Sequence, residues 1–452
     1  MRDASRSRGG SLSANPRRVA LAVLRATKEG AVPEDILNRD GVMLSQKDRA
    51  LASAMVYACL RHQSRLDSLL DGKLAQPGST PSLVRMILRL GLSQLLFFDR
   101  LAHHAVVNET TELSKKLAPG REGLVNAVLR SFLADKEKGP YWPVELDGAG
   151  TPVARRLSVF YSYPQWMVEK FLDEWGFRDT RSFLVAGNRQ TPPTIRVNTG
   201  LVERGLLAAR LPFPSLPTKY SPWGLLPQDF AGHPDTWPGY HEGHFSIQDE
   251  ASQVAGLLCG KPRRILDACA GLGGKGLALK ALHPAAEVVA LDISPGKLSL
   301  LREEARRLRL PGDIQTRQAD VLTEKFRPSF DLVFLDAPCS GLGVIRRRPD
   351  IKWKKSEGDI ASLAALQAGL LSSASKAVSP GGRLIYSVCT VTDEEGPSVA
   401  RRFLSDNPGF SPAGDVPDAL SDAAIAPGML RFLPHRHGTD GFFYAVLERK
   451  GG

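Results

Sequence analysis

The chain has 452 residues, more than one ordinary hydrophobic core accommodates, so two or three domains are expected. Its hydrophobic fraction of 42% and charged fraction of 24% are typical of soluble globular proteins. No apolar run approaches the roughly 20 residues of a membrane-spanning helix. The net charge of +11 indicates a polyanionic partner, most often nucleic acid, although a merely basic chain would have it too.

Five unevenly spaced cysteines without a CxxC pair suit neither a disulfide framework nor a zinc site, so no metal is expected and the predicted compartment is the cytoplasm. Residues 1–16 are basic and polar, with no apolar signal core after them, which predicts a disordered tail.

Residues 17–138 carry a helical apolar period throughout, for example at Leu124, Val128 and Phe132, and predict a helical bundle with Cys59 in its core. The segments 17–19, 47–49 and 123–130 resemble the NusB-type RNA-binding domain. That resemblance implies an RNA-binding or docking module.

Residues 139–244 are rich in Pro, Gly and Trp, which break helices and favour turns. A linker is expected near 135–150. The alternating segment Thr194–Thr199 then predicts a strand, and we interpret the region as a linker followed by a small α+β subdomain.

Residues 245–450 alternate between strands and helices, which predicts a parallel, doubly wound, Rossmann-like sheet. The multidomain fold expected is therefore an all-α bundle, a small α+β subdomain and an α/β domain. The strands of the last domain are predicted at 265–267, 288–292, before Asp320, and at 330–336, 384–388 and 442–447.

A glycine loop, Gly271–Gly276, follows the first of these strands and matches the pattern GxGxxG, which is a weak signal alone. NAD and S-adenosylmethionine would both suit it, with Asp292 binding a ribose hydroxyl. Asp267 before the loop, Asp320 placed to reach an adenine, and two thiols elsewhere favour S-adenosylmethionine.

The two thiols, Cys339 and Cys389, each follow a predicted strand of the same sheet. Methylation of cytosine at C5 requires a nucleophile that adds to C6, an acidic group near ring N3 and a proton acceptor. Asp336, Cys339 and Cys389 supply such a set, and Lys275 could lower the pKa of a nearby thiol. Spacing does not tell which cysteine attacks, and free cysteines at strand ends are often only small buried side chains.

At these residues the chain resembles the RNA 5-cytosine methyltransferases of the NOL1/NOP2/Sun type. The resemblance is carried by the segments 336–341, 344–353, 245–253 and 434–443, and with the NusB-like region it covers about residues 17–448.

The resemblance implies S-adenosylmethionine as cofactor, small-subunit (16S) ribosomal RNA as partner, Cys389 as nucleophile and Cys339 as the residue that assists product release. Two features depart from the family: Leu272 and Gly276 replace Pro and Thr in the glycine loop, and Val388 replaces the usual Thr. The implied cofactor contacts are Cys269, Ala270, Gly271, Leu272, Gly273, Gly274, Lys275, Asp292, Asp320 and Asp336.

Two basic segments, Arg346–Arg348 and Lys352–Lys355, interleave cations with Trp353 and are expected to contact RNA phosphates, with base stacking. The protein is expected to be a monomer without membrane attachment. The alternatives are an NAD-dependent oxidoreductase, resting on the glycine loop and Asp292, and an RNA-binding ribosome-assembly factor without activity.

Overall fold

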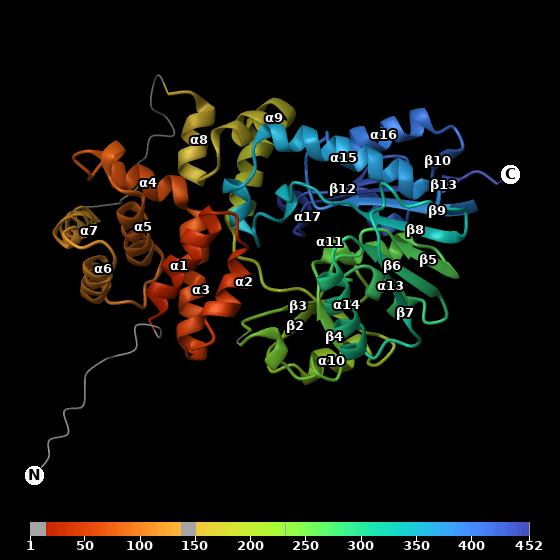
Figure 1. Ribbon diagram of the computed structural model, residues 1–452, viewed down its shortest axis with the longest axis horizontal. Helices are drawn as coiled ribbons and strands as arrows, with labels where there is room; N and C mark the ends of the chain where they lie inside the picture. The colour runs from red at the N-terminus through yellow and green to blue at the C-terminus, as the bar shows by residue number, and fades with distance from the viewer. Residues whose placement is uncertain (1–14, 137–150, 231, 452) are drawn as a thin grey trace, which may run out of the picture. The chain divides into compact units, whose positions relative to one another are not determined.

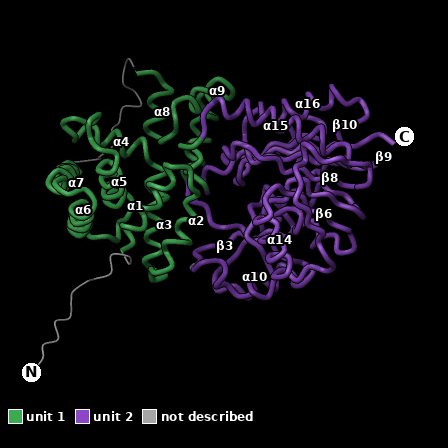
Figure 2. Tube along the Cα trace, in the orientation of Figure 1, with its two compact units in different colours: residues 1–188, 348–354 green, residues 189–347, 355–452 purple. Residues whose placement is uncertain are grey.

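A computed structural model describes residues 15–136, 151–230 and 232–451, so most of the expected tail, residues 1–16, and most of the expected linker near 135–150 lie outside the described residues (Figure 1). Packing divides the chain into two compact units, residues 1–188 with 348–354 and residues 189–347 with 355–452 (Figure 2). Over the described ranges, no helix is both long and apolar enough to cross a membrane.

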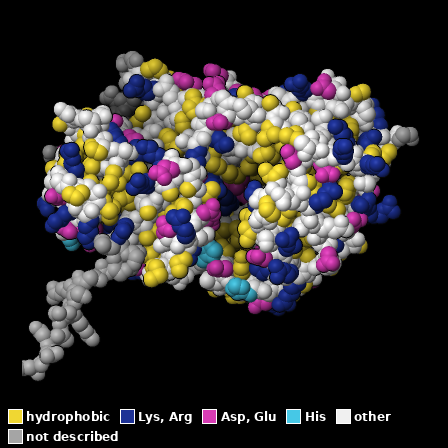
Figure 3. Space-filling view, in the orientation of Figure 1, with side chains coloured by type: hydrophobic (Ala, Val, Ile, Leu, Met, Phe, Trp, Pro, Cys, Tyr) yellow, Lys and Arg dark blue, Asp and Glu magenta, His cyan; other side chains and the backbone are white. Residues whose placement is uncertain are grey.

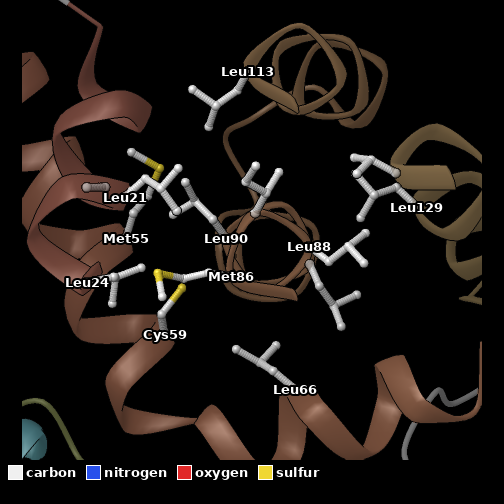
Figure 4. Close-up of a cluster of buried hydrophobic side chains, with 14 of the residues drawn as sticks. Leu21, Leu24, Met55, Cys59, Leu66, Met86, Leu88, Leu90, Leu113 and Leu129 are labelled. Atoms are coloured by element: carbon white, nitrogen blue, oxygen red, sulfur yellow. The ribbon is translucent and has the colours of Figure 1, made fainter. Parts of the chain in front are cut away.

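The first unit is built of helices, and most of them share one core. Side chains from α1, α3, α4, α5, α6 and α7 meet there (Figure 4), and Cys59 among them is 2% exposed, as predicted. The helices are α1 (Pro16–Lys28), α2 (Pro33–Asp40), α3 (Gln46–Arg61), α4 (Gln63–Asp71), α5 (Ser82–Phe97), α6 (His103–Leu117), α7 (Glu122–Lys136), α8 (Val153–Tyr161) and α9 (Gln165–Asn188).

Local sequence sets the ends of several of these helices. The side chain of Asn15 accepts hydrogen bonds from the first backbone N–H groups of α1, and Ser45 caps α3 in the same way. Gly176 interrupts α9 with φ of 71°, a conformation that side chains with a Cβ rarely adopt. The inserted segment 348–354 forms a short 3-10 helix, Pro349–Trp353, in this unit.

A small antiparallel sheet with the order β2-β3-β1-β4 opens the second unit, in agreement with the predicted α+β subdomain. Ile195, Leu207, Trp237 and Phe245 belong to its core. The elements are β1 (Ile195–Val197), α10 (Arg204–Arg210), β2 (Ser215–Pro217), β3 (Gly224–Pro227) and β4 (Phe245–Ile247).

A larger sheet follows, with the order β11-β12-β13-β9-β8-β5-β6-β7 and β10 beside β13. Strands β5 to β9 pair in parallel, as predicted, and the Rossmann-like class is confirmed. The strands are β5 (Arg264–Asp267), β6 (Glu287–Asp292), β7 (Ile314–Gln318), β8 (Phe330–Asp336), β9 (Val378–Val388), β10 (Phe410–Pro412), β11 (Ala424–Ala426), β12 (Met429–Phe432) and β13 (Phe442–Arg449).

The expectation of a parallel sheet is wrong for the last strands, because β13 runs antiparallel to both β9 and β12. A parallel pair needs a crossover of about a dozen residues or more, usually a helix. Only residues 433–441 join β12 to β13, so the chain returns as a hairpin-like pair.

Helices cover both faces of the large sheet (Figure 1). Alternate residues of β9 enter different cores: Tyr386 and Val388 pack with α15 and α16, whereas Ile385 packs with α11, α12 and α13. The helices are α11 (Glu250–Gln253), α12 (Ala255–Leu258), α13 (Gly276–Leu282), α14 (Pro295–Arg307), α15 (Glu357–Ser375), α16 (Pro397–Asp406) and α17 (Pro434–His437).

Candidate active site

The two cysteines meet at the carboxyl edge of β8 and β9. These strands are parallel neighbours, and Asp336 of β8 lies opposite Ser387 of β9 in the register. Both strands end at this level. The Sγ atoms of Cys339 and Cys389, which follow them, lie 3.2 Å apart and are both partly buried. The prediction that both thiols occupy one edge of the sheet is therefore confirmed.

Asp336 and Lys275 form an ion pair beside the thiols. One carboxylate oxygen of Asp336 accepts from the Lys275 ammonium, and the other accepts from the Ser387 hydroxyl at 2.9 Å. The ammonium also lies 4.9 Å from the centre of the Phe442 ring. Burial of Lys275, whose side chain is 9% exposed, strengthens its attraction to the carboxylate.

Lys275 was expected to lower the pKa of a nearby thiol, whereas the net shift at Cys339 is upward. The hydrogen bond to Cys389 is the largest cause that raises the pKa of Cys339 well above its usual range, and burial and nearby carboxylates raise it further. Cys339 therefore holds its proton more tightly than an ordinary thiol.

A cavity of about 220 Å³ lies at the carboxyl end of β5. Gly271 in its wall and Gly273 in the same loop have φ of 56° and 86°, and a Cβ on Gly273 would come within 2.7 Å of Leu301, so glycine is required there. The lining residues are Gln248, Ser252, Asp267, Cys269, Ala270, Gly271, Leu272, Gly274, Lys275 and Asp336.

Two residues of this wall, Gln248 and Ser252, had no role assigned from the sequence. The Gln248 amide donates to the carbonyl of Gly274 at 3.0 Å and to the Ser252 hydroxyl at 3.1 Å, so it fixes the glycine loop from outside. Both residues belong to the segment 245–253, whose resemblance to the family was the sequence feature that could have identified them.

Asp292 and Asp320, both predicted to contact a cofactor, do not line this cavity. Asp292 accepts from the backbone N–H of Gly271 at 2.9 Å and of Ser294 at 2.8 Å, so it anchors the glycine loop. Asp320 is exposed and accepts from the N–H of Leu322 at 2.9 Å.

Asp267 is the buried carboxylate of the cavity. It is 1% exposed, and its Oδ1 has no hydrogen-bond partner among the described residues. Burial, followed by the charge of Asp336, raises the pKa of Asp267 to about 7. Such an acceptor inside a cavity is suited to a ligand that brings a donor or a positive charge.

The structure gives physical reasons for the departures from the family pattern. A Cβ at Gly276 would collide with Oδ2 of Asp267, so the glycine lets α13 begin directly against that carboxylate. Val388 is 0% exposed and packs in the sheet core, where an apolar side chain needs no hydrogen-bond partner. Leu272 is 57% exposed, so its side chain is free of such constraints.

The expectation that Arg346 and Arg347 contact RNA is wrong. Both guanidinium groups pair with the buried carboxylates of Asp249 and Asp440, at distances of 2.8–2.9 Å for three of the four pairs. Arg346 is only 6% exposed. The four charges therefore fasten the loop after Cys339 to the start of α11 and to the segment before β13.

Lys352 and Trp353 are also structural rather than RNA-facing. Lys352 is 0% exposed, and its ammonium donates to the carbonyls of Arg61 and Ser162 at 2.8 Å and lies 4.2 Å from the centre of the Tyr163 ring. The Trp353 indole donates to the carbonyl of Leu60 at 2.7 Å. On the face in Figure 3, Lys and Arg side chains lie among Asp and Glu side chains rather than in one basic patch.

Three family models match the chain. Residues 257–448 match the 16S rRNA methyltransferase RsmB/F, residues 14–134 match the NusB family, and residues 163–223 match the ferredoxin-like domain of RsmF/B-like methyltransferases. These matches agree with the NusB-like, α+β and methyltransferase parts predicted from the sequence.

Solved structures show the same fold. The crystal structure of PH0851 has a TM-score of 0.78 and 24% identity, over 97% of this chain and all of that one. NSun6 from Pyrococcus horikoshii has a TM-score of 0.57 and 20% identity, over 65% of this chain and all of that one.

Curated relatives match over nearly their whole length. Ribosomal RNA small subunit methyltransferase B of Thermus thermophilus is 35% identical over 96% of this chain and 98% of its own. The probable ribosomal RNA small subunit methyltransferase B of Bacillus subtilis is 34% identical over 90% and 92%. The two thiols, the glycine loop and the NusB-like helices are thus found in a chain that belongs to the ribosomal RNA small subunit methyltransferase B family.

Proposed function

We propose that the protein methylates carbon 5 of a cytosine in small-subunit (16S) ribosomal RNA, with S-adenosylmethionine as methyl donor and a covalent link between Cys389 and cytosine C6. The observation that carries the proposal is the pair of thiols 3.2 Å apart beside the ion pair of Lys275 and Asp336. Family membership supports the ribosomal RNA as substrate.

The cavity at the glycine loop fits S-adenosylmethionine better than NAD. Its wall holds the carboxylates of Asp267 and Asp336, and its single lysine already pairs with Asp336. A ligand with an ammonium and a sulfonium is attracted by such a lining, whereas a pyrophosphate is repelled. When bound, the cofactor supplies a methyl group on a sulfonium. This charge pattern argues against the NAD-dependent alternative.

Cys389 is the sulfur best suited to attack. Because Cys339 retains its proton and hydrogen-bonds to Cys389, it can stabilise negative charge on the attacking sulfur. Addition forms a bond from Sγ of Cys389 to C6 and makes C5 electron-rich. The Lys275 ammonium, held by Asp336, supplies a hydrogen bond where charge develops on the ring.

The reaction ends when C5 loses its proton to a base and the electrons of that bond expel the sulfur from C6. Cys339 is the group next to Cys389 that can assist this release. The target cytosine must be unpaired or flipped out of its helix to reach the thiols.

The test is incubation of the protein with methyl-labelled S-adenosylmethionine and 16S ribosomal RNA transcripts, followed by nucleoside mass spectrometry. We expect 5-methylcytosine with the parent protein and none with Cys389→Ala. Cofactor and RNA binding without methyl transfer to any ribosomal transcript would favour the non-catalytic assembly factor instead.

A further inference from the structure

Glu395 is a buried carboxylate behind the two cysteines. It is 0% exposed, and its two oxygens accept five hydrogen bonds, all from uncharged groups. The donors are Ser340 N at 2.7 Å, Ser340 Oγ at 2.5 Å, Thr392 Oγ1 at 3.0 Å, Thr390 Oγ1 at 3.1 Å and Gln367 Nε2 at 3.1 Å.

Four of the five hydrogen bonds come from the two loops that carry the cysteines, here called the cysteine loops: one contains Cys339 and follows β8, and the other contains Cys389 and follows β9. Ser340 directly follows Cys339, and Thr390 directly follows Cys389, so one carboxylate holds the residue after each thiol. The hydroxyls of Ser340 and Thr390 also lie 2.8 Å from each other. A displacement of either loop would therefore break hydrogen bonds to a carboxylate that water does not reach.

Neighbouring contacts fix Glu395 itself. The Tyr386 hydroxyl donates to the backbone carbonyl of Glu395 at 2.5 Å, and the Gln367 amide donates both to its carboxylate and, at 2.9 Å, to the carbonyl of Pro338. Tyr386 belongs to β9 and Gln367 to α15, both inside the sheet core. Glu395 itself belongs to the segment 389–396 that follows Cys389, and these contacts tie that segment to β9 and α15.

We propose that Glu395 is a positioning residue that sets the distance between the two thiols, a role that rests on the proposed function. A sulfur that attacks C6 and a sulfur that assists the release of the first both act at one ring, so their separation must be held. A misplacement of about 1 Å can cost about 100-fold in rate. Glu395 does not line the cofactor cavity, so cofactor binding should not depend on it.

The test compares Glu395→Gln with Asp393→Asn. Both replace a carboxylate by an amide in one segment, but Asp393 pairs with Arg431 at 2.6 Å and with Ser398 at 3.1 Å instead of with the cysteine loops. We expect Glu395→Gln to lower kcat roughly 10- to 100-fold, with KM for RNA and Kd for S-adenosylmethionine changed by less than about twofold. Asp393→Asn should keep kcat near that of the parent.

A second measurement needs no RNA. Two protein thiols and one oxidised glutathione exchange to give the Cys339–Cys389 disulfide and two reduced glutathiones, and the equilibrium constant reports how closely the thiols are held. Peptide mass spectrometry identifies the Cys339–Cys389 link. We expect this constant to fall at least about fivefold in Glu395→Gln and not in Asp393→Asn.

The outcomes separate the two proposals. A parent protein that methylates nothing refutes the proposed function, while the disulfide equilibrium still tests the role of Glu395. Unchanged kcat and an unchanged disulfide constant in Glu395→Gln would overturn the positioning role, as would a loss of cofactor affinity as large as the loss of kcat. Should Glu395→Gln not fold, Thr392→Val, which removes one donor, carries the same comparison with a smaller expected effect.

Discussion

The Sγ atoms of Cys339 and Cys389 lie 3.2 Å apart, although 50 positions separate the two residues in the sequence. The parallel pairing of β8 and β9 delivers both thiols to one edge of the sheet, and the ion pair of Lys275 and Asp336 lies beside them. In this geometry the hydrogen bond between the sulfurs is the largest cause that raises the pKa of Cys339.

The proposed role of Cys389 as nucleophile predicts that Cys389→Ala abolishes methyl transfer, because its sulfur is the atom that would bond to C6. We expect a loss of at least about 10⁴-fold in kcat, measured by incorporation of labelled methyl groups into RNA. Cys59→Ala is the matched control: Cys59 is buried in the helical core, so its loss should affect stability and leave the chemistry intact. Comparable activity of Cys389→Ala and parent would exclude Cys389 as nucleophile.

A different result is expected for Cys339→Ala. Attack by Cys389 can still occur, but release is impaired, so a protein–RNA adduct should accumulate and survive denaturing gel electrophoresis. The double variant Cys339→Ala/Cys389→Ala should show no adduct. A Cys339→Ala protein that turns over freely, with no trapped RNA, would contradict the release role.

The strand ends and thiols of this site could be predicted from the sequence. Two apolar runs, which end in Asp336-Ala337-Pro338-Cys339 and in Val388-Cys389, indicate buried strands that are followed by reactive side chains. Glu395 could not. Its importance arises from donors at positions 340, 367, 390 and 392, which only the tertiary fold assembles around it.

The environment of the two basic segments, 346–348 and 352–355, also depends on the tertiary fold. A run of Arg and Lys with a Trp has the composition of an RNA-binding loop, and composition does not show which carboxylates or carbonyls face it. Asp249 and Asp440 neutralise Arg346 and Arg347 from distant parts of the chain. Likewise, nothing local shows that residues 348–354 pack in the helical unit.

Lys275→Ala should lower kcat about 10²–10³-fold, because it removes the hydrogen-bond donor proposed to act where charge develops on the base. The variant also leaves Asp336 without its cationic partner. Lys297→Ala, on the exposed face of α14, is the control and should retain parental kinetics. Steady-state kinetics with saturating RNA would measure the effect, and a change confined to the KM for RNA would contradict this role.

The raised pKa of Asp267 predicts a pH-dependent stability in the cofactor-free protein. The folded-state pKa of about 7 lies above the unfolded value of about 3.9, so the folded state binds the proton more tightly. The stabilisation is complete below about pH 4 and is lost as the pH rises to about 7, with a total of up to about 4 kcal/mol.

Asp267→Asn should flatten this dependence, because the amide does not titrate. Urea unfolding at about pH 5 and about pH 7.5 would measure the difference for the parent and the variant. Asp313→Asn, at an exposed carboxylate, is the control. Parallel pH profiles for the parent and Asp267→Asn would show that Asp267 ionises normally.

Lys352 provides the test of whether its segment stabilises the fold or contacts RNA. Its buried ammonium donates to Arg61, Ser162 and Asn188, so Lys352→Met would leave those acceptors unsatisfied while roughly keeping the side-chain volume. We expect a destabilisation of about 2–4 kcal/mol, measured by denaturant unfolding. Lys355→Met, which falls just outside the inserted segment 348–354, should change stability by less than about 0.5 kcal/mol.

RNA binding discriminates the two roles of Lys352 further. A lysine that contacts a phosphate contributes to the salt dependence of binding, and its loss reduces the slope of log K against log salt by about 0.9 in duplexes and 0.7 in single strands. Because the Lys352 ammonium is buried against backbone carbonyls, we expect Lys352→Met to leave this slope unchanged at a temperature where it is folded. If Lys352→Met instead reduced the slope by the amount of one phosphate contact and kept the stability of the parent protein, the Lys352 ammonium would be shown to contact RNA.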